Sequence, residues 1–296
     1  MKKLVKLLIN ALAVLMLFVT TIGMTACADI KTLEVVVQVY DFDEREFLSE
    51  EDVTFELELY RHLAPQTVDA IIAHVQNGYY DNTFFYVEEA SGYNVLLVGD
   101  LKFDTEGNVV QNLIDGKQPS QIYGEFEANG VKGSDLLAEK GTVGLYRTYF
   151  NNDANYDASS TARDSGRATW MLPQVSSAGY NGYYCMFGKY DLDGNALTAI
   201  DAVTDVLQTT GSYTSYIIYY TGEYDASKPD ENFGLTFHCI PEVTFNEMTD
   251  EEKEEVFYAE GEQYEFYSKR RIHIPKIVDP DTINASTASI KSVKVK

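Results

Sequence analysis

Basic residues are scarce in this chain of 296 residues. It has 23 Lys and Arg against 46 Asp and Glu, which gives a formal net charge of −23 with neutral histidines. A surface this acidic repels phosphate backbones, so the composition argues against nucleic acid as a partner. The excess of acid points to no other partner, and solubility is its simplest explanation.

Cysteine and histidine are also few, and neither is spaced like a set of metal ligands. The three cysteines are Cys27, Cys185 and Cys239, and none stands at zinc-site spacing from another. Cys185 and Cys239 could pair in an exported protein, but Cys185 lies in an apolar stretch and is interpreted as a buried strand residue with a structural thiol. The four histidines are scattered, and no phosphate loop or Ser–His–Asp set is recognisable. We therefore expect neither a metal nor a cofactor.

The N-terminus has the features of an export signal. Lys2, Lys3 and Lys6 precede an apolar run over residues 7–24, and Thr-Ala-Cys follows, ending at Cys27. A basic start, an apolar segment and small residues before the cut define a secretory signal. A cysteine in this place resembles the lipobox of bacterial lipoproteins. We therefore expect residues 1–26 to be a signal peptide and a lipid on Cys27 to anchor the protein to the outer face of the bacterial cytoplasmic membrane. An uncleaved N-terminal anchor helix is the alternative, and it also leaves the rest of the chain outside the cytoplasm.

Alternation of apolar and polar residues predicts a chain built mainly of strands. The clearest case is VTFELELY at 53–60, whose apolar residues fall on one face. The acidic stretch 41–52 is interpreted as a solvated loop, and 104–108 and 191–195 as turns. Further strands are expected at 33–40, 84–87, 95–98, 141–149, 168–172, 183–190 and 289–296.

Two segments have the period of a helix instead. Apolar residues recur three and four positions apart at 65–78, which begins with Pro and ends with Asn-Gly, and again at 197–207. The region 209–285 is rich in Tyr and then acidic, and Thr249 and Glu252 are set as a capping box for a short helix.

Six short motifs, in this order, resemble the cyclophilin family of peptidyl-prolyl isomerases. The resemblance implies a mainly β fold, a closed antiparallel eight-stranded barrel with two capping helices. That domain would comprise residues 27–208 and 286–296, with 209–285 as an α+β insertion within it. The motifs are FELELYRHLAPQTVDAIIAHVQNGYYDNTF at 55–84, VGD at 98–100, IYGE at 122–125, GTVGLYRT at 141–148, FGK at 187–189 and IKSVKV at 290–295.

The resemblance also implies a reaction, prolyl cis/trans isomerisation, and a set of site positions. In the family an arginine donates to the imide nitrogen, and a glutamine steers the carbonyl. Here the positions implied to be catalytic hold Tyr86 in place of the arginine, Leu97 in place of the glutamine and Tyr184 in place of a histidine. The positions implied to contact substrate hold Phe84, Asn94, Val95, Tyr146, Arg147, Ala168, Trp170 and Tyr180.

These replacements predict weak catalysis. Tyr86 offers one neutral O–H where a charged donor is about twice as strong, and losing such a contact costs about 100- to 1,000-fold in rate. We expect a peptidyl-prolyl isomerase-like protein that acts on proline-containing segments of extracytoplasmic proteins, with reduced catalysis. Arg147, Arg163 or Arg167 could replace the missing charge. The alternatives are a non-catalytic module that binds a proline-containing peptide or a partner on a cyclophilin scaffold, and an envelope structural protein whose own side chains close the groove.

Overall fold

The computed structural model describes residues 29–41, 46–88, 94–132, 136–147, 166–192, 194–196, 200–201, 203–204, 213–221, 236–252, 267–275, 277–278 and 285–296. Outside these residues lie the predicted export signal, Cys27 with its predicted lipid, Arg163 and most of the predicted helix at 197–207. Within the described ranges, no helix is long and apolar enough to cross a membrane.

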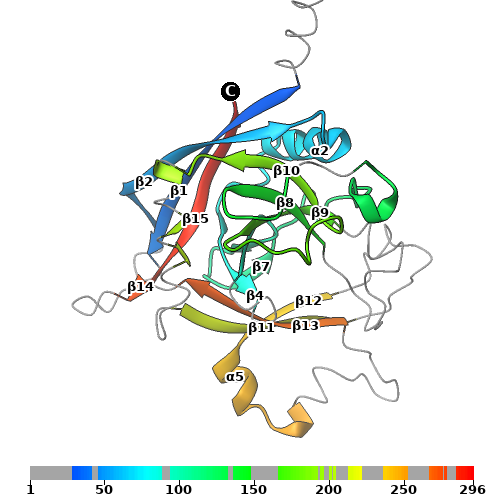
Figure 1. Ribbon diagram of the computed structural model, residues 1–296. Coiled ribbons are helices and arrows are strands. Elements are labelled where there is room, and N and C mark those ends of the chain that lie inside the picture. Colours follow the sequence, from blue (N-terminus) through cyan, green and yellow to red (C-terminus); the bar gives the residue numbers. More distant parts are fainter. Residues whose placement is uncertain are drawn as a thin grey trace, which may run out of the picture.

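A large antiparallel sheet of 11 strands curls around the main core of the protein (Figure 1). The strands follow the order β5-β9-β8-β10-β2-β1-β15-β3-β6-β7, and β14 pairs with β15. The predicted mainly β, antiparallel fold is thus confirmed. The strands are β1 (Ile30–Asp41), β2 (Glu46–Tyr60), β3 (Thr83–Phe84), β5 (Val95–Val98), β6 (Leu101–Phe103), β7 (Val109–Gln111), β8 (Thr142–Arg147), β9 (Gly166–Pro173), β10 (Cys185–Tyr190), β14 (Ile277–Val278) and β15 (Ala285–Val295).

The first two strands form a long hairpin that extends into the acidic stretch. The prediction of a loop over 41–52 is wrong for most of that range, because β1 ends at Asp41 and β2 begins at Glu46. Asp41 pairs with Glu46, and Val39 pairs with Leu48 after a shift in register. Pairing with a neighbouring strand satisfies the backbone, and this outweighs the poor strand propensity of Asp and Glu.

The helix predicted at 65–78 is α2 (Pro65–Gln76), which packs against the inside of the curled sheet. Its proline occupies the first turn, where no backbone donor is lost. Two backbone N–H groups of that turn, from Gln66 and Thr67, donate to the carboxylate of Glu125 at 3.0 and 2.7 Å. A carboxylate at a helix N-terminus accepts from unpaired N–H donors and interacts favourably with the positive end of the helix dipole. Glu125, which is distant in sequence, therefore fixes the start of α2.

The main core fills the space between this helix and the curled sheet. Alternate residues of β1 and β2 point inward, as the period-two pattern predicted, and they meet Val68 and Ile71 of α2. Ile200 and Val203, from the predicted second helix, are buried in the same cluster. The hydroxyl of Thr204 donates to the carbonyl of Ile200 at 2.8 Å, as expected for a helical turn.

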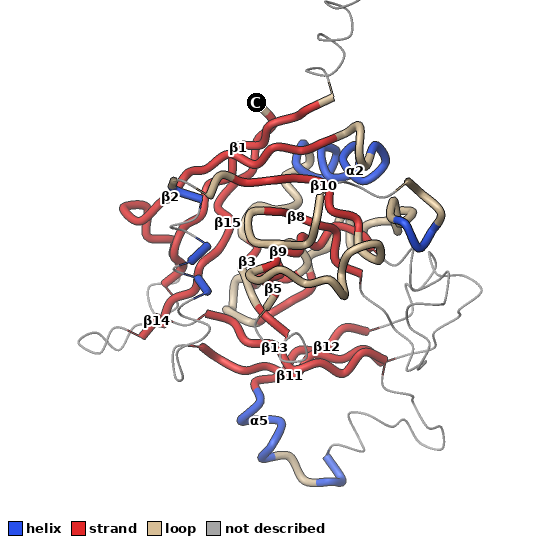
Figure 2. The backbone as a smooth tube through the Cα atoms, viewed as in Figure 1, coloured by secondary structure: helices blue, strands red, loops and turns tan. Residues whose placement is uncertain are grey.

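A second, smaller sheet lies against the curled one. Its order is β12 (Thr236–Pro241), β11 (Tyr213–Thr221), β13 (Tyr267–Pro275) and β4 (Val87–Glu88), so the segment 209–285 supplies three of its four strands. Helix α5 (Glu242–Glu247) follows β12. Figure 2 shows β11, β12 and β13 below the curled sheet, with α2 and β10 at the other end of the molecule.

Local sequence signals are confirmed at several other points. The backbone N–H of Thr249 donates to the Glu252 carboxylate at 2.7 Å, and the N–H of Glu252 donates to the Thr249 hydroxyl at 3.1 Å, which completes the predicted capping box. In the turn at 104–108, the Asp104 carboxylate accepts two backbone N–H groups at 2.8 Å. The 3-10 helix η2 (Glu127–Asn129) was not predicted.

The predicted burial of Cys185 in a strand is also confirmed. Cys185 lies in β10, and burial raises the pKa of its thiol to about 12. Cys239 lies in β12, and burial raises the pKa of its thiol to about 12 as well. Both thiols are free.

Candidate functional site

Tyr86 stands at the junction of the two sheets. It lies between β3 of the curled sheet and β4 of the smaller sheet, and it exchanges two backbone hydrogen bonds with Leu97 of β5, at 2.9 and 2.8 Å. Its side chain is 0 % exposed, and its hydroxyl donates to the carboxylate of Asp100, with oxygens at 2.9 and 3.0 Å. The phenol is therefore held in one position and its donor is in use.

A second apolar cluster surrounds the Tyr86 ring. It forms where the smaller sheet lies on the outer face of the curled sheet, so the face expected to be a peptide groove is an interior contact instead. From the curled sheet and its connections the cluster takes Phe84, Tyr86, Val95, Leu97, Leu101, Val109 and Met171, and from the smaller sheet Ile218, Ile272 and Ile274.

The two residues predicted on β9 point away from this face. Ala168 and Trp170 belong to the main core, and the Trp170 ring centroid is 4.4 Å from that of Tyr80. Met171, the next residue, pairs with Leu97 and packs in the second cluster beside it. Side chains alternate between the faces of a strand, so a shift of one residue exchanges the two sets. Sequence reasoning missed Met171, although its place directly opposite Leu97 would have identified it once the strand pairing was known.

The structure separates the predicted neighbours Asn94 and Val95. Asn94 is exposed, and its carbonyl accepts the backbone N–H of Gln174 at 2.8 Å. Val95 is buried in the second cluster together with Phe84 and Tyr86. Of these predicted contacts, the structure thus brings Phe84 and Val95 to Tyr86 and leaves Asn94 outside.

An aromatic rim formed by Tyr146, Tyr180 and Tyr184 borders the cluster. Each ring is partly exposed, and the Tyr184 centroid lies 6.4 Å from that of Tyr146 in a stacked pair and 5.1 Å from that of Tyr180 in an edge contact. The Tyr146 hydroxyl donates to the buried carboxylate of Glu88 at 2.7 Å. Burial raises the pKa of Tyr180, and the nearby Tyr184 and Glu88 add to the shift. The three rings are thus pre-arranged at the edge of the covered face.

The guanidinium of Arg147 packs against the aromatic rim. Its guanidinium carbon lies 4.4 Å from the Tyr184 ring centroid and 5.3 Å from that of Phe126, and the residue is buried. Such stacking favours a planar cation over an aromatic face. Arg167 is turned elsewhere and donates to the carbonyl of Pro119.

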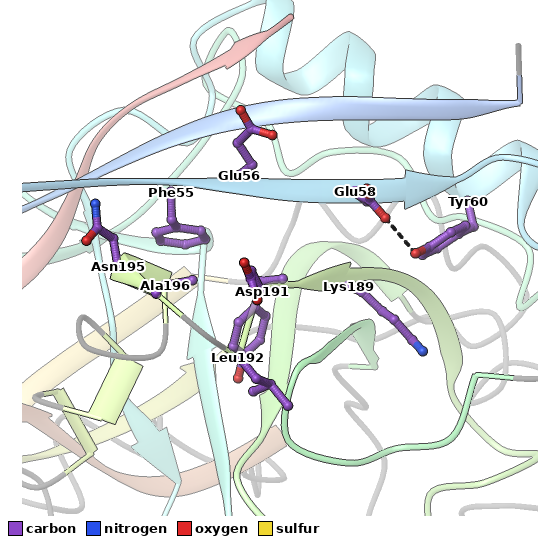
Figure 3. A pocket seen from close by; sticks show the side chains of 11 residues that line it. Phe55, Glu56, Glu58, Tyr60, Lys189, Asp191, Leu192, Asn195 and Ala196 are labelled. Atoms are coloured by element: carbon purple, nitrogen blue, oxygen red, sulfur yellow. Dashed lines mark hydrogen bonds between the residues drawn. The ribbon is translucent and has the colours of Figure 1, made fainter. Parts of the chain in front are cut away.

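A separate pocket of about 790 Å³ opens at the other end of the molecule (Figure 3). It lies between β2 and the segment that follows β10, with Phe55 and Tyr190 in its wall and the carboxylates of Glu56 and Glu58 beside it. The Tyr60 hydroxyl donates to Glu58 at 2.7 Å. This pocket contains none of the predicted site residues. In the described part of the chain, no group of three or more His, Cys, Asp or Glu side chains is placed to hold a metal ion.

A large curled antiparallel sheet with a helix packed against its core is consistent with the cyclophilin-like fold that the sequence resemblance implied. The family model "Cyclophilin type peptidyl-prolyl cis-trans isomerase/CLD" matches residues 47–214, more than half of the chain. The chain belongs to the cyclophilin-type peptidyl-prolyl cis-trans isomerase family, and a peptidyl-prolyl isomerase-like function follows from this membership.

Two solved structures are similar to parts of the chain. The chain is similar to the cyclophilin type peptidyl-prolyl cis-trans isomerase of Cryptosporidium parvum, with 14% identity and a TM-score of 0.37, over 61% of this chain and 88% of that one. A structure of that protein in the presence of the dipeptide Ala-Pro matches with 17% identity and a TM-score of 0.36, over 60% of this chain and 88% of that one. No curated protein matches the chain.

Proposed function

We propose that this protein is an exported, lipid-anchored member of the isomerase family that acts on proline-containing segments outside the cytoplasm with strongly reduced catalysis. The proposal rests on the burial of Tyr86 and on the hydrogen bond that its hydroxyl makes. This residue occupies the position at which the family resemblance implies the catalytic arginine, it is fully buried, and its hydroxyl already donates to Asp100.

Isomerisation needs a donor aimed at the imide nitrogen while the amide loses its conjugation. The uncatalysed barrier is about 18–20 kcal/mol, and a preorganised charged donor lowers it by favouring the developing lone pair. Tyr86 carries no charge, and its single O–H cannot serve Asp100 and a substrate nitrogen together. We expect a catalytic rate about 100- to 1,000-fold below that of a family member with the arginine.

Leu97 supports the same conclusion. It occupies the position implied for the glutamine, and an aliphatic side chain offers no donor to a substrate carbonyl. Its backbone N–H and C=O are both bonded to Tyr86. Under the assignment that the resemblance implies, two of the polar groups that the reaction requires are replaced together.

Export and lipidation rest on the N-terminal sequence. Lys2, Lys3 and Lys6, the apolar run and Cys27 support a lipoprotein signal whose mature chain begins at the lipidated cysteine. Expression of the full chain in a bacterium that processes lipoproteins should give a membrane-bound product lacking residues 1–26, with a mass increased by the lipid. A Cys27→Ser variant should lose that increase. A product of the natural chain that retains Met1 or carries no lipid would contradict the assignment.

A second candidate, a non-catalytic binding module, is favoured by the aromatic rim. Tyr146, Tyr180 and Tyr184 remain partly exposed, and ordered tyrosine rings offer flat surfaces on which proline rings and extended segments pack. In this reading the rim holds the segment, and no acceleration of isomerisation follows.

Exchange NMR on a short Xaa-Pro peptide mixed with residues 28–296 tests both candidates. An ordinary member of the family serves as the positive control, and a Tyr184→Ala variant reports whether the rim makes the contact. We expect exchange at no more than about one hundredth of the control rate. Peptide shifts without acceleration that are lost in Tyr184→Ala would favour the binding module. A rate close to that of the control would refute the proposal of reduced catalysis.

A further inference from the structure

We propose that β11, β12 and β13 form a built-in blocking element that keeps proline-containing segments off the face carrying Tyr86 and Leu97. This inference rests on the proposed function, because it concerns access to the same face. It adds a cause that the substitution of single residues does not supply: the chain itself occupies the place of the substrate.

The blocking sheet is joined to the site by its backbone. Ile272 of β13 pairs with Glu88, and His273 pairs with Val87, so the sheet hydrogen-bonds to the two residues that directly follow Tyr86 along β4. Antiparallel pairing with an extended segment is one way in which proteins bind peptides. In this molecule a strand of the same chain uses that pairing.

Its side chains fill the space above the face. Ile218 and Ile272 are 0 % exposed, and so is Tyr86, against which their cluster packs. Tyr216, Phe237 and Cys239 pack around the margin of the same cluster. Because these side chains pack against Tyr86, a proline ring could reach its phenol only if the sheet moved away.

The inner side of the blocking sheet is apolar, whereas its outer side carries both polar and apolar residues. On the outer side, the Ser215 hydroxyl and His273 Nδ1 are 2.9 Å apart, and Arg271 pairs with Glu242 of α5 at 2.7 Å. On the inner side lie Ile218 and Ile272. On the outer side Ile217 is also buried, against Ile240 and against Phe245 of α5. Lifting the sheet would expose apolar surface on both partners, so we infer that the sheet separates only rarely and that catalysis at this face is limited to the few molecules in which it has separated.

The two free cysteines provide a direct probe of this block. In residues 28–296 they are the remaining cysteines, since Cys27 is removed. Cys239 lies on β12 opposite Ile218, against the blocked cluster, whereas Cys185 lies in the main core. Cys239 is partly exposed on the edge strand β12, so a rise in its labelling by a small maleimide above the rate in the natural protein reports separation of the sheet. Labelling of the buried Cys185 reports opening of the curled sheet.

The test compares Ile272→Ala in the blocking sheet with Ile71→Ala in α2. Both isoleucines are 0 % exposed, but Ile71 belongs to the main core. We expect Ile272→Ala to raise the labelling rate of Cys239 at least tenfold with that of Cys185 unchanged, and to make binding of an Ala-Pro peptide detectable by NMR at Tyr86 and Leu97. Ile71→Ala should not produce this pattern. Ile218→Ala is the replacement if Ile272→Ala does not fold.

Three results would overturn the block. The first is peptide binding at Tyr86 and Leu97 in the natural protein, with no rise in the labelling rate of Cys239 when the peptide is added. The second is a variant in which Cys239 becomes reactive but no peptide binds. The third is a folded Ile272→Ala variant in which Cys239 is labelled no faster than in the natural protein, which would mean that the packing of Ile272 does not hold the sheet on this face.

These outcomes are separate from those of the proposed function. Binding without acceleration in the natural protein removes the block and leaves reduced catalysis standing. An opened Ile272→Ala variant that binds the peptide and isomerises it at an ordinary family rate confirms the block and refutes a catalytic defect at Tyr86.

Discussion

Removing the hydroxyl of Tyr86 should destabilise the protein far more than removing a similar hydroxyl at the surface. The Tyr86 O–H donates to the Asp100 carboxylate from a side chain that is 0 % exposed. A hydrogen bond to a charged group contributes about 1.5–3 kcal/mol to the free energy of unfolding. In Tyr86→Phe the ring still packs in the second cluster, so this bond accounts for the loss. We expect the free energy of unfolding to fall by about 2 kcal/mol.

Urea unfolding followed by circular dichroism measures the effect. With a slope of about 2–3 kcal/mol per molar urea, the midpoint should fall by about 0.7–1 M. The matched control is Tyr60→Phe, because the Tyr60 hydroxyl also donates to a carboxylate, Glu58 at 2.7 Å, but in an exposed pair. Exposed pairs of this kind contribute well under about 1 kcal/mol. Equal midpoint shifts in the two variants would refute the reasoning that burial makes the Tyr86–Asp100 bond strong.

Three further predictions concern the curled sheet and α2. Glu125→Gln removes the charge that accepts two N–H groups of the first turn of α2, and should lower the free energy of unfolding by about 1 kcal/mol; no change in the urea midpoint would exclude this cap. Gly99 has φ +117°, and a Cβ there would lie 2.9 Å from the Tyr80 ring, so Gly99→Ala should destabilise by about 2–3 kcal/mol. Gly107→Ala, with φ +86° but open space, should cost about 1 kcal/mol, and equal costs would contradict a steric role for Gly99. Burial lowers the pKa of His74 below 6.5, so the unfolded chain binds the proton first and stability should fall as pH drops below about 6.5. His74→Gln should weaken that dependence on pH, and an unchanged slope would remove His74 as its source.

The curled sheet was largely predictable because its signals are local. Strict alternation at 53–60, an apolar run at 95–98 and a helical period at 65–78 each correspond to an element of the structure. The acidic stretch after β1 was misjudged, because its strand depends on pairing with Val39 and Asp41 and not on its own composition. The predicted strand at 84–87 divides between β3 and β4 for a similar reason, since each half pairs with a different sheet.

The candidate site was predictable only in part. Motif order assigned Tyr86 and Leu97, and their mutual backbone bonds place them together. On β9 the motif alone did not distinguish Met171 from Trp170, because that choice depends on the register against β5. Nothing local in the segment 209–285 indicates that its apolar side covers this face, since that contact joins residues more than 100 positions apart in sequence.

The blocking sheet also explains why the site residues depart from the family pattern. An arginine at position 86 would lie beneath Ile218 and Ile272, and a charge removed from water there costs several kcal/mol unless it is fully paired. Tyrosine avoids that cost, because its ring joins the apolar cluster and its one donor is satisfied by Asp100. Leu97 and Met171 likewise bring no polar group that would need a partner under the sheet. The loss of the catalytic groups and the presence of the blocking sheet therefore follow from one physical requirement. A face that is buried must be apolar or fully hydrogen-bonded.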